Sequence, residues 1–389
     1  MRRSTPYVHL LLAVVSFAAS PIAAWAATHS GCRVDAARRP EGPRPLCWCG
    51  VQSEDRADEL AAAIEHWASF LARSDCMRED FQQVRQAGEP VAAIAARSLA
   101  GGRRLAALYR LASLQDLVGG MEYELAHLGE DALDLAKVEA TWQQEQKALG
   151  DSLMPIDAQA FAQVQPLAVR AIAEAAAGQV RGYFEASLDY ARATIPETGL
   201  YYIGAARAER DLAALARRLH EVTHGEPPTL RRIAGDIDDL ERELLAAYLP
   251  PASLARNREF ISAHSALQDA RTFDAAGLRA AALLRYLQGA VRAAALLQDK
   301  GEGDRAALQR RLAALLEQAT VDDVDHSIAL MLLEVAEVEL EMAKDGAPTP
   351  AAVGVAWALP RYFAALQPSA DHAQPRAELT VTLVRWPFT

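Results

Sequence analysis

The sequence lacks the short motifs that mark the common catalytic loops. It has no serine in a nucleophile elbow, no phosphate-binding loop and no dinucleotide-binding glycine fingerprint. It also lacks a basic stripe, and its 40 Lys and Arg residues are outnumbered by 51 Asp and Glu residues. The resulting net charge of −11 repels phosphate backbones, so we expect no nucleic-acid partner.

Runs of β-branched residues are rare between residues 52 and 367, where Ala, Leu, Arg and Glu dominate. Glycines and prolines recur there at helix-length intervals and predict turns. The turns are expected at Gly101-Gly102, Gly119-Gly120, Gly150, Pro196 with Gly199, Gly225 to Pro228, Pro250-Pro251, Gly301 to Gly303, and Pro348 with Pro350. The pattern predicts an all-α domain over 52–367, with about ten to twelve antiparallel helices in a bundle or a helical-hairpin stack. If this domain has two lobes, we expect the break near 196–200 or 250–251.

Two of the expected helices carry an apolar stripe at three- and four-residue steps. In 276–299 the stripe is Leu278, Ala282, Leu283, Tyr286, Leu287, Ala290 and Ala294, and in 326–343 it is Ile328, Met331, Leu332, Val335, Val338 and Met342. Such stripes are typical of core-facing helices. We therefore expect these residues in the core rather than around a cofactor.

The first residues have the composition of an export signal. Arg2 and Arg3 precede an apolar run from Val8 to about Ala19, and Ala24-Trp25-Ala26 fits the small-residue cleavage rule. The pattern predicts a signal peptide over 1–26 and a periplasmic or secreted protein. No later stretch of spanning length is free of charges, so only an uncleaved signal would tie the chain to a membrane.

All four cysteines lie near the expected mature start: Cys32, Cys47, Cys49 and Cys76. The segment 27–51 is also rich in Pro, Gly and Arg, and we expect it to be irregular. Disulfide bonds persist in exported proteins. Cys47 and Cys49 would form a strained ring with each other, so each is expected to pair with Cys32 or Cys76, and the connectivity stays open.

The tail over 368–389 differs in composition from the rest. Its last residues alternate, with Leu379, Val381 and Leu383 on one side and Thr380, Thr382 and Val384 on the other. This pattern predicts a short C-terminal β-strand. A single strand needs a partner, and we expect either the stretch 46–51 or the sheet edge of another protein.

One motif suggests a metal. His220-Glu221-Val222-Thr223-His224 has the H-E-x-x-H spacing, which places both histidines on one face of a helix. Over about 25 residues it resembles the zincin metallopeptidases that have a downstream glutamate. The resemblance implies His220 and His224 as zinc ligands, Glu221 as the general base, and Glu241 or Glu243 as a third ligand.

The surroundings of the motif argue against zinc. The apolar seam of this helix is Leu212, Leu215, Leu219 and Val222, and both histidines point away from it. Ala213 and Ala216 form a short small-residue groove below His220, which Glu209 interrupts. Gly225 and Pro227 end the helix directly after the second histidine, where the helix dipole alone favours such a residue. We therefore expect no metal, cofactor or catalytic residue, and keep a zinc-dependent hydrolase as the alternative.

Together these features indicate an exported, all-α binding or scaffolding module of a bacterial cell envelope rather than an enzyme. The expected partner is a protein or peptide, since stacked helices offer long concave surfaces. A groove lined by Tyr201, Tyr202, Tyr286 and Tyr362 would serve such a partner. The acidic run from Asp236 to Glu243 is expected to be a solvated helix face, paired with Arg231 and Arg232.

Overall fold

A computed structural model gives the fold of residues 56–72, 79–128, 133–220, 227–249, 254–297, 304–343 and 348–366. Within these ranges the chain forms thirteen α-helices, three short 3-10 helices and no strand. The all-α prediction is confirmed, and the predicted number of helices was slightly too low. The predicted signal peptide, the segment 27–51, the four cysteines and the C-terminal strand lie outside the described residues.

The helices follow one another along the chain with short connections. In order they are α2 (Arg56–Ala72), α3 (Glu79–Ala100), α4 (Arg104–Ala112), α5 (Gln115–His127), α6 (Leu135–Leu149), η4 (Gly150–Leu153), η5 (Ala158–Phe161), α7 (Leu167–Ala193), α8 (Pro196–Arg218), α9 (Ala234–Ala247), η6 (Leu254–Arg256), α10 (Asn257–Ala275), α11 (Arg279–Leu297), α12 (Arg305–Thr320), α13 (Ser327–Met342) and α14 (Pro350–Leu366).

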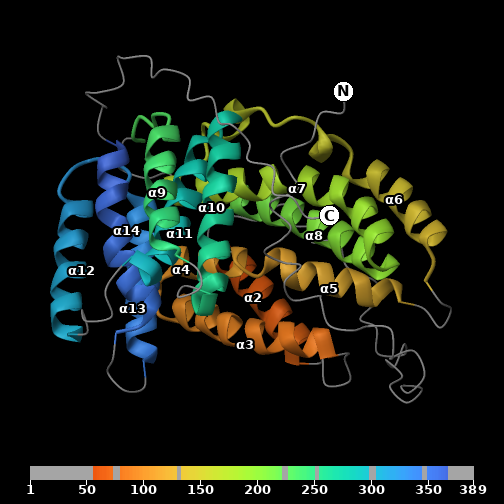
Figure 1. Cartoon of the computed structure of the whole chain (residues 1–389), viewed down its shortest axis with the longest axis horizontal. Helices are drawn as coiled ribbons and strands as arrows, with labels where there is room; N and C mark the ends of the chain where they lie inside the picture. Colours follow the sequence, from red (N-terminus) through yellow and green to blue (C-terminus); the bar gives the residue numbers. More distant parts are fainter. Residues whose placement is uncertain are drawn as a thin grey trace.

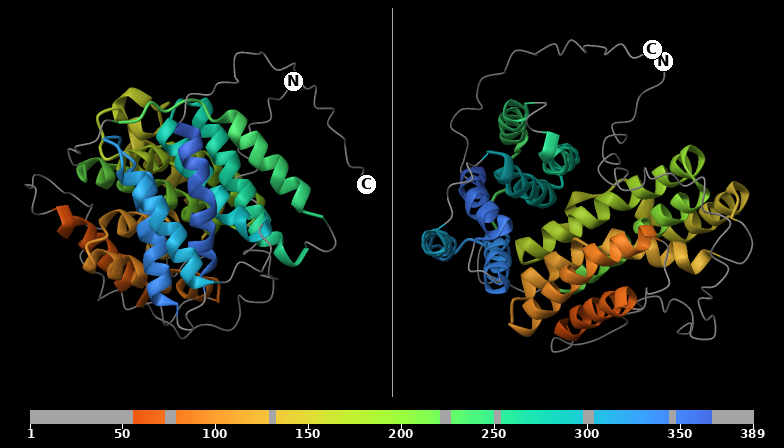
Figure 2. Two further views of the ribbon diagram at one scale, coloured as in Figure 1. Left: turned by 90° about the vertical axis from the view of Figure 1, so that its left-hand side faces the viewer. Right: turned by 60° about the horizontal axis from the view of Figure 1, so that its bottom comes forward.

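Two helical hairpins organise the molecule. The long helices α7 and α8 form one, and α10 and α11 form the other; α11 also packs against α7 and α14, and α5 packs along α8. In Figure 1 the first hairpin lies across the view, whereas α9 to α14 stand upright beside it. The right-hand view of Figure 2 shows α2 to α5 on the opposite side of α7 and α8 from α9 and α10. The middle helices are therefore covered on several sides.

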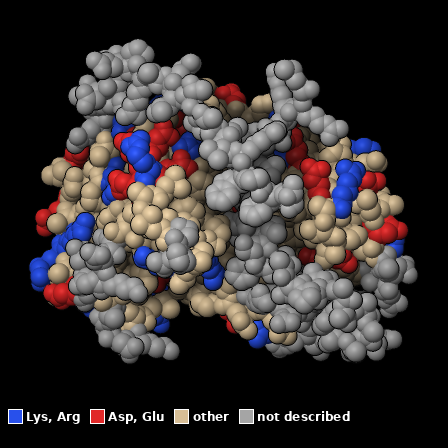
Figure 3. Space-filling view, viewed as in Figure 1, with Lys and Arg blue, Asp and Glu red and all other residues tan. Residues whose placement is uncertain are grey.

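One apolar cluster joins these layers and runs from Leu60 to Ala365. The predicted stripe of 276–299 is buried at every position, and that of 326–343 at every position except Met342, which is half-buried. Of the described helices, α11 alone has the length and apolar composition to cross a membrane, and 67% of that window is buried inside the protein. Packing of this kind is typical of a core helix. On the face in Figure 3, acidic and basic side chains are interspersed.

The predicted turn at Gly119-Gly120 is wrong, because both glycines lie inside α5. A Cβ atom on Gly119 would stand 2.3 Å from the Cβ of Ala208, and one on Gly204 would stand 2.4 Å from the Cβ of Tyr123. These glycines are needed where α5 and α8 cross at backbone distance. By contrast, Gly102 does lie in a turn, with a φ of +77°.

The predicted aromatic groove is also wrong. Tyr202, Tyr286 and Tyr362 are only 2%, 4% and 0% exposed, so they belong to the core. Tyr201 is half-buried and stacks edge-on against Tyr202. These rings pack within the protein, as aromatic residues at helical spacing usually do.

Candidate functional site

The first histidine of the H-E-x-x-H motif supports a neighbouring helix. His220 directly follows the C-cap of α8, and its Nδ1 atom accepts a hydrogen bond of 2.8 Å from the backbone N–H of Gln165. In a neutral imidazole whose Nδ1 accepts, the other ring nitrogen carries the proton. While this bond is kept, neither nitrogen offers a lone pair to zinc. Glu221 and His224 lie outside the described residues.

His220 is one of three side chains that satisfy the start of α7. The backbone N–H of Leu167 donates to Asp325 at 2.7 Å, and that of Ala168 donates to Ser327 at 2.8 Å. The first amides of a helix have no partner within it, and burial makes such partners necessary. The end of α8 and the start of α13 therefore fix the start of α7. This gives His220 a structural role.

The two suggested third ligands are occupied as well. Glu241 accepts 2.7 Å hydrogen bonds from Arg271 and Gln268, and the neighbouring His264 and Arg271 lower its pKa to about 2. Glu243 accepts a hydrogen bond of 3.1 Å from Arg361. Among the described residues, no group of three or more His, Cys, Asp or Glu side chains is arranged to hold a metal ion.

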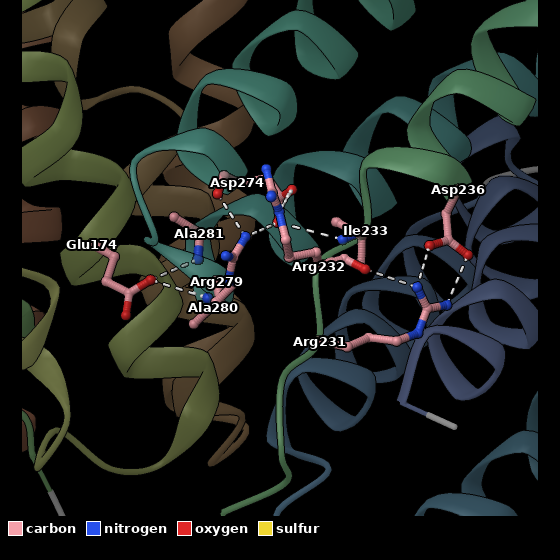
Figure 4. A network of polar contacts seen from close by, with 9 residues as sticks. All are labelled: Glu174, Arg231, Arg232, Ile233, Asp236, Asp274, Arg279, Ala280 and Ala281. Atoms are coloured by element: carbon pink, nitrogen blue, oxygen red, sulfur yellow. Dashed lines mark hydrogen bonds and ion pairs between the residues drawn. The ribbon is translucent and has the colours of Figure 1, made fainter. Parts of the chain in front are cut away.

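Three acidic residues, Asp236, Asp274 and Glu174, belong to a network of paired polar groups (Figure 4). Asp236 binds Arg231 through two hydrogen bonds of 2.7 and 2.9 Å, as the sequence predicts. Arg232 instead lies 3.7 Å from Asp274 of α10. Asp274 also pairs with Arg279 and accepts from the N–H of Ile233.

Glu174 completes this network from α7. It is fully buried and accepts from the N–H groups of Ala280 and Ala281 at 3.0 and 3.1 Å, which caps the start of α11. Arg170 donates to the same carboxylate at 2.7 Å. Each carboxylate in Figure 4 accepts at least two hydrogen bonds, so a structural role accounts for this network.

A different situation exists for four charged side chains from α5, α8, α10 and α11, which are linked by their effects on the pKa values of Glu209 and Asp269. Asp116, Glu209, Asp269 and Arg285, one from each helix, form a group that we call the acid cluster. Glu209 is 3% exposed and Asp269 is 8% exposed. No hydrogen bond from the described part of the chain reaches either carboxyl group. Buried acids in this condition are costly, so their presence needs an explanation.

Arg285 does not satisfy the two acids. Its Nε atom lies 4.0 Å from Asp269, too far for a hydrogen bond, and this nitrogen is fully buried without a partner. Its Nη1 atom donates to Gln288 at 3.0 Å. Arg285 forms no hydrogen bond with Glu209, and its charge only lowers the pKa of that residue against the larger effect of burial. The acid cluster thus contains two acceptors and one donor that have no hydrogen bond.

Arg285 contributes one of the fully buried side-chain nitrogens that have no hydrogen bond. Among the described residues, only Arg110 Nε, His264 Nδ1 and Arg285 Nε are both fully buried and without a hydrogen bond. The carboxyl oxygens of Glu209 and Asp269 have no hydrogen bond either, so each must keep some contact with space that water can occupy.

Neighbouring residues hold Asp116 in place at the start of α5. The indole of Trp67 donates to Gln115 at 2.8 Å, and the amide of Gln115 donates to the carbonyl of Ala208 at 3.0 Å. These bonds tie the start of α5 to Ala208, the residue before Glu209. Tyr183 of α7 donates to Asp116 at 2.6 Å.

Burial raises the pKa values of both buried acids of the acid cluster. Burial, reinforced by the charge of Asp116, raises the pKa of Glu209 well above its ordinary value. Burial also raises the pKa of Asp269 to about 6, although Arg285 and Arg292 oppose the shift. Burial raises the pKa of Tyr183 well above 10, so its hydroxyl stays a donor. Perturbed groups of this kind concentrate at functional sites.

The sequence matches no protein-family model, and no curated protein or solved structure shows significant similarity to it. The function must therefore be argued from the chemistry of the site.

The sequence interpretation missed the acid cluster. Glu209 was noticed only as an interruption of a small-residue groove, yet it is buried in that groove beside Ala213 and Ala216. A glutamate on a face otherwise made of alanines was the available signal. Asp269 and Arg285 gave none, because charged residues are common on amphipathic helices.

Proposed function

We propose that the chain is an exported α-helical binding module of a bacterial cell envelope, and that it binds a small polar ligand at the acid cluster. The observation that carries the proposal is the set of unsatisfied groups on Glu209, Asp269 and Arg285. A fold selected for stability alone has no use for them, since apolar residues of similar size would be less costly there.

The other buried acids make the contrast clear. Glu59, Glu145, Glu174, Asp274 and Asp325 each accept hydrogen bonds from neighbouring groups. The chain therefore pairs its buried acids where their role is structural. Leaving Glu209 and Asp269 without a hydrogen bond favours a role in binding, because natural sites give up stability for function.

A small ligand suits this setting better than a protein surface. A stable protein interface buries roughly 800 Å² on each partner, whereas Glu209 and Asp269 are almost wholly enclosed. The protein or peptide partner expected from the sequence would have to use the outer surface instead. The leader composition supports export, so we expect the binding event in the periplasm or outside the cell.

A thermal-shift screen tests this function. The mature protein is heated with a library of small polar metabolites, and a ligand that binds only the folded state raises the melting temperature. The shift should disappear in a Glu209→Gln, Asp269→Asn double variant. It should persist in a Glu185→Gln control, which alters an exposed residue of α7 paired with Arg181. If no compound protects the protein, or if one protects the double variant equally, the proposal is wrong.

A further inference from the structure

We infer that the end of the α9–α10 hairpin binds the surface of an anionic phospholipid bilayer. The observation behind the inference is a group of exposed leucines, Leu245, Leu249 and Leu254, which we call the leucine tip. Their exposed fractions are 53%, 67% and 56%. Single apolar residues are common on protein surfaces, whereas an apolar patch marks a contact with a protein or a membrane.

The exposed apolar side chains are unevenly distributed along the chain. Six large apolar side chains are exposed among the described residues, and three of the six belong to the leucine tip. The others are Met154, Leu316 and Val321, which lie elsewhere in the sequence. One short stretch of the described chain therefore carries half of this exposed apolar surface.

Local contacts hold the leucine tip together. Its residues lie in the last turn of α9, directly after the C-cap residue Tyr248, and at the start of η6, which leads into α10. The hydroxyl of Tyr248 donates to Asn257 at 2.8 Å, and its ring stacks on Phe260 with 4.1 Å between the centroids. These contacts join the two helix ends, so the three leucines lie at the same end of the hairpin. The left view of Figure 2 shows that end of α9 at the edge of the molecule.

The core does not require these leucines. Ile237, Leu240 and Leu244 form the inner face of α9, and each is 1% exposed or less. Leu245 lies outside that face, and the other two leucines follow the end of the helix. Leaving them in water costs free energy that a polar residue at the same position would not cost. A contact that covers them would recover it.

The charges around the leucine tip fit an anionic surface. The chain as a whole has a net charge of −11, so anionic lipids repel it. The stretch 244–258 contains no acidic residue and carries Arg256 and Arg258. Of the two acids that flank it, Glu243 pairs with Arg361, and Glu259 is exposed. This stretch can therefore approach an anionic surface more closely than the acidic remainder of the protein.

A bilayer suits the leucine tip better than a protein partner does. A stable protein interface buries roughly 800 Å² on each side, and three leucine side chains at the end of a hairpin supply much less. A bilayer needs only a few apolar side chains that enter the headgroup region while neighbouring arginines stay among the phosphates. Leucines beside Tyr and Arg have the composition of such an interfacial segment.

Vesicle flotation of the mature protein tests the inference, because an uncleaved leader would bind lipid by itself. Vesicles of phosphatidylethanolamine and phosphatidylglycerol should carry the protein upward with them. Vesicles of phosphatidylcholine alone should carry much less, because they offer the arginines no negative surface. Binding to the anionic vesicles should weaken as salt is added, since salt screens these charges.

Variants then assign the contact to the leucine tip. Leu249→Ser, Leu254→Ser should lower the partition onto anionic vesicles roughly tenfold or more, because two apolar side chains no longer leave water. Arg258→Gln should lower it roughly fivefold. Leu316→Ser is the matched control, since Leu316 is 46% exposed on α12 and should change nothing. All these side chains are exposed, so the melting temperature should stay close to that of the wild type.

Three results would overturn the inference. The first is a wild-type protein that does not bind the anionic vesicles, or that binds phosphatidylcholine equally well. The second is binding that Leu249→Ser, Leu254→Ser leaves unchanged, because lipid would then contact another part of the chain. The third is self-association in analytical ultracentrifugation that depends on these two leucines while no vesicle is bound, because the leucine tip would then join two copies of the protein.

Discussion

Asp269 should lower the stability of the folded protein at neutral pH, and Asp269→Asn should remove that penalty. Burial raises its pKa from 3.8 to about 6. Below pH 3.8 the carboxyl is protonated in both states and costs nothing. As the pH rises from there to about 6, the unfolded state ionises first and stability falls. At 1.36 kcal/mol for each pKa unit, the full penalty above the folded pKa is about 3 kcal/mol.

The assay is urea unfolding of the wild type and of Asp269→Asn at about pH 4 and about pH 7. The stability difference between the two proteins should move by about 2 kcal/mol in favour of the variant between these conditions, because part of the penalty is already present at pH 4. Other titrating groups are shared and cancel in this difference. Asp323→Asn serves as the control, because Asp323 is exposed and should show no such movement.

A flat difference across this range would refute the reasoning, since it would mean that Asp269 titrates alike in both states. A movement of the opposite sign would show that Asp269 is stabilised as an anion, by Arg285 or another donor. In that case the acid cluster would be a satisfied ion pair, and the proposed function would lose its main support.

Four further predictions follow from the fold and the sequence. Gly204→Ala should destabilise the protein by about 3 kcal/mol in urea unfolding, because the new methyl group would stand 2.4 Å from a side chain of α5. Asp325→Ala should cost about 2 kcal/mol in the same assay, since two buried amides lose their acceptor. Zinc analysis should find equally negligible metal in the wild type and in His220→Ala, His224→Ala, and zinc present only in the wild type would contradict the capping role of His220. The exported protein should have the intact mass expected after cleavage behind Ala26, and a full-length cytoplasmic product would contradict export.

The helical fold was readable from composition and spacing. Apolar residues at three- and four-residue steps predicted the buried faces of α11 and α13 because helical geometry alone brings them to one side. Turns at Gly101-Gly102 and before Pro196 followed from local chemistry in the same way. Gly119-Gly120 misled the prediction, because the need for small residues there comes from α8, which lies far along the chain.

The metal motif shows the same limit. The spacing of His220 and His224 can be read from the sequence. The hydrogen bond from the backbone N–H of Gln165 to His220 cannot, because Gln165 lies far from the motif along the chain. The helical wheel assumed a helix that continues through His224, but α8 ends at Arg218, so His220 lies beyond the helix, and His224 lies outside the described residues. The sequence could not show which group would contact His220.

The sequence by itself determined that this protein is helical and acidic, since these properties depend on residue types and on spacings within one helix. It also predicts export. Only the tertiary structure decided which charges are paired. Glu174 and Glu209 look alike along the chain, yet the first meets two helix amides and the second meets no donor. The reason is physical: the cost of a buried charge is set by the partners that surround it, and those partners come from other helices.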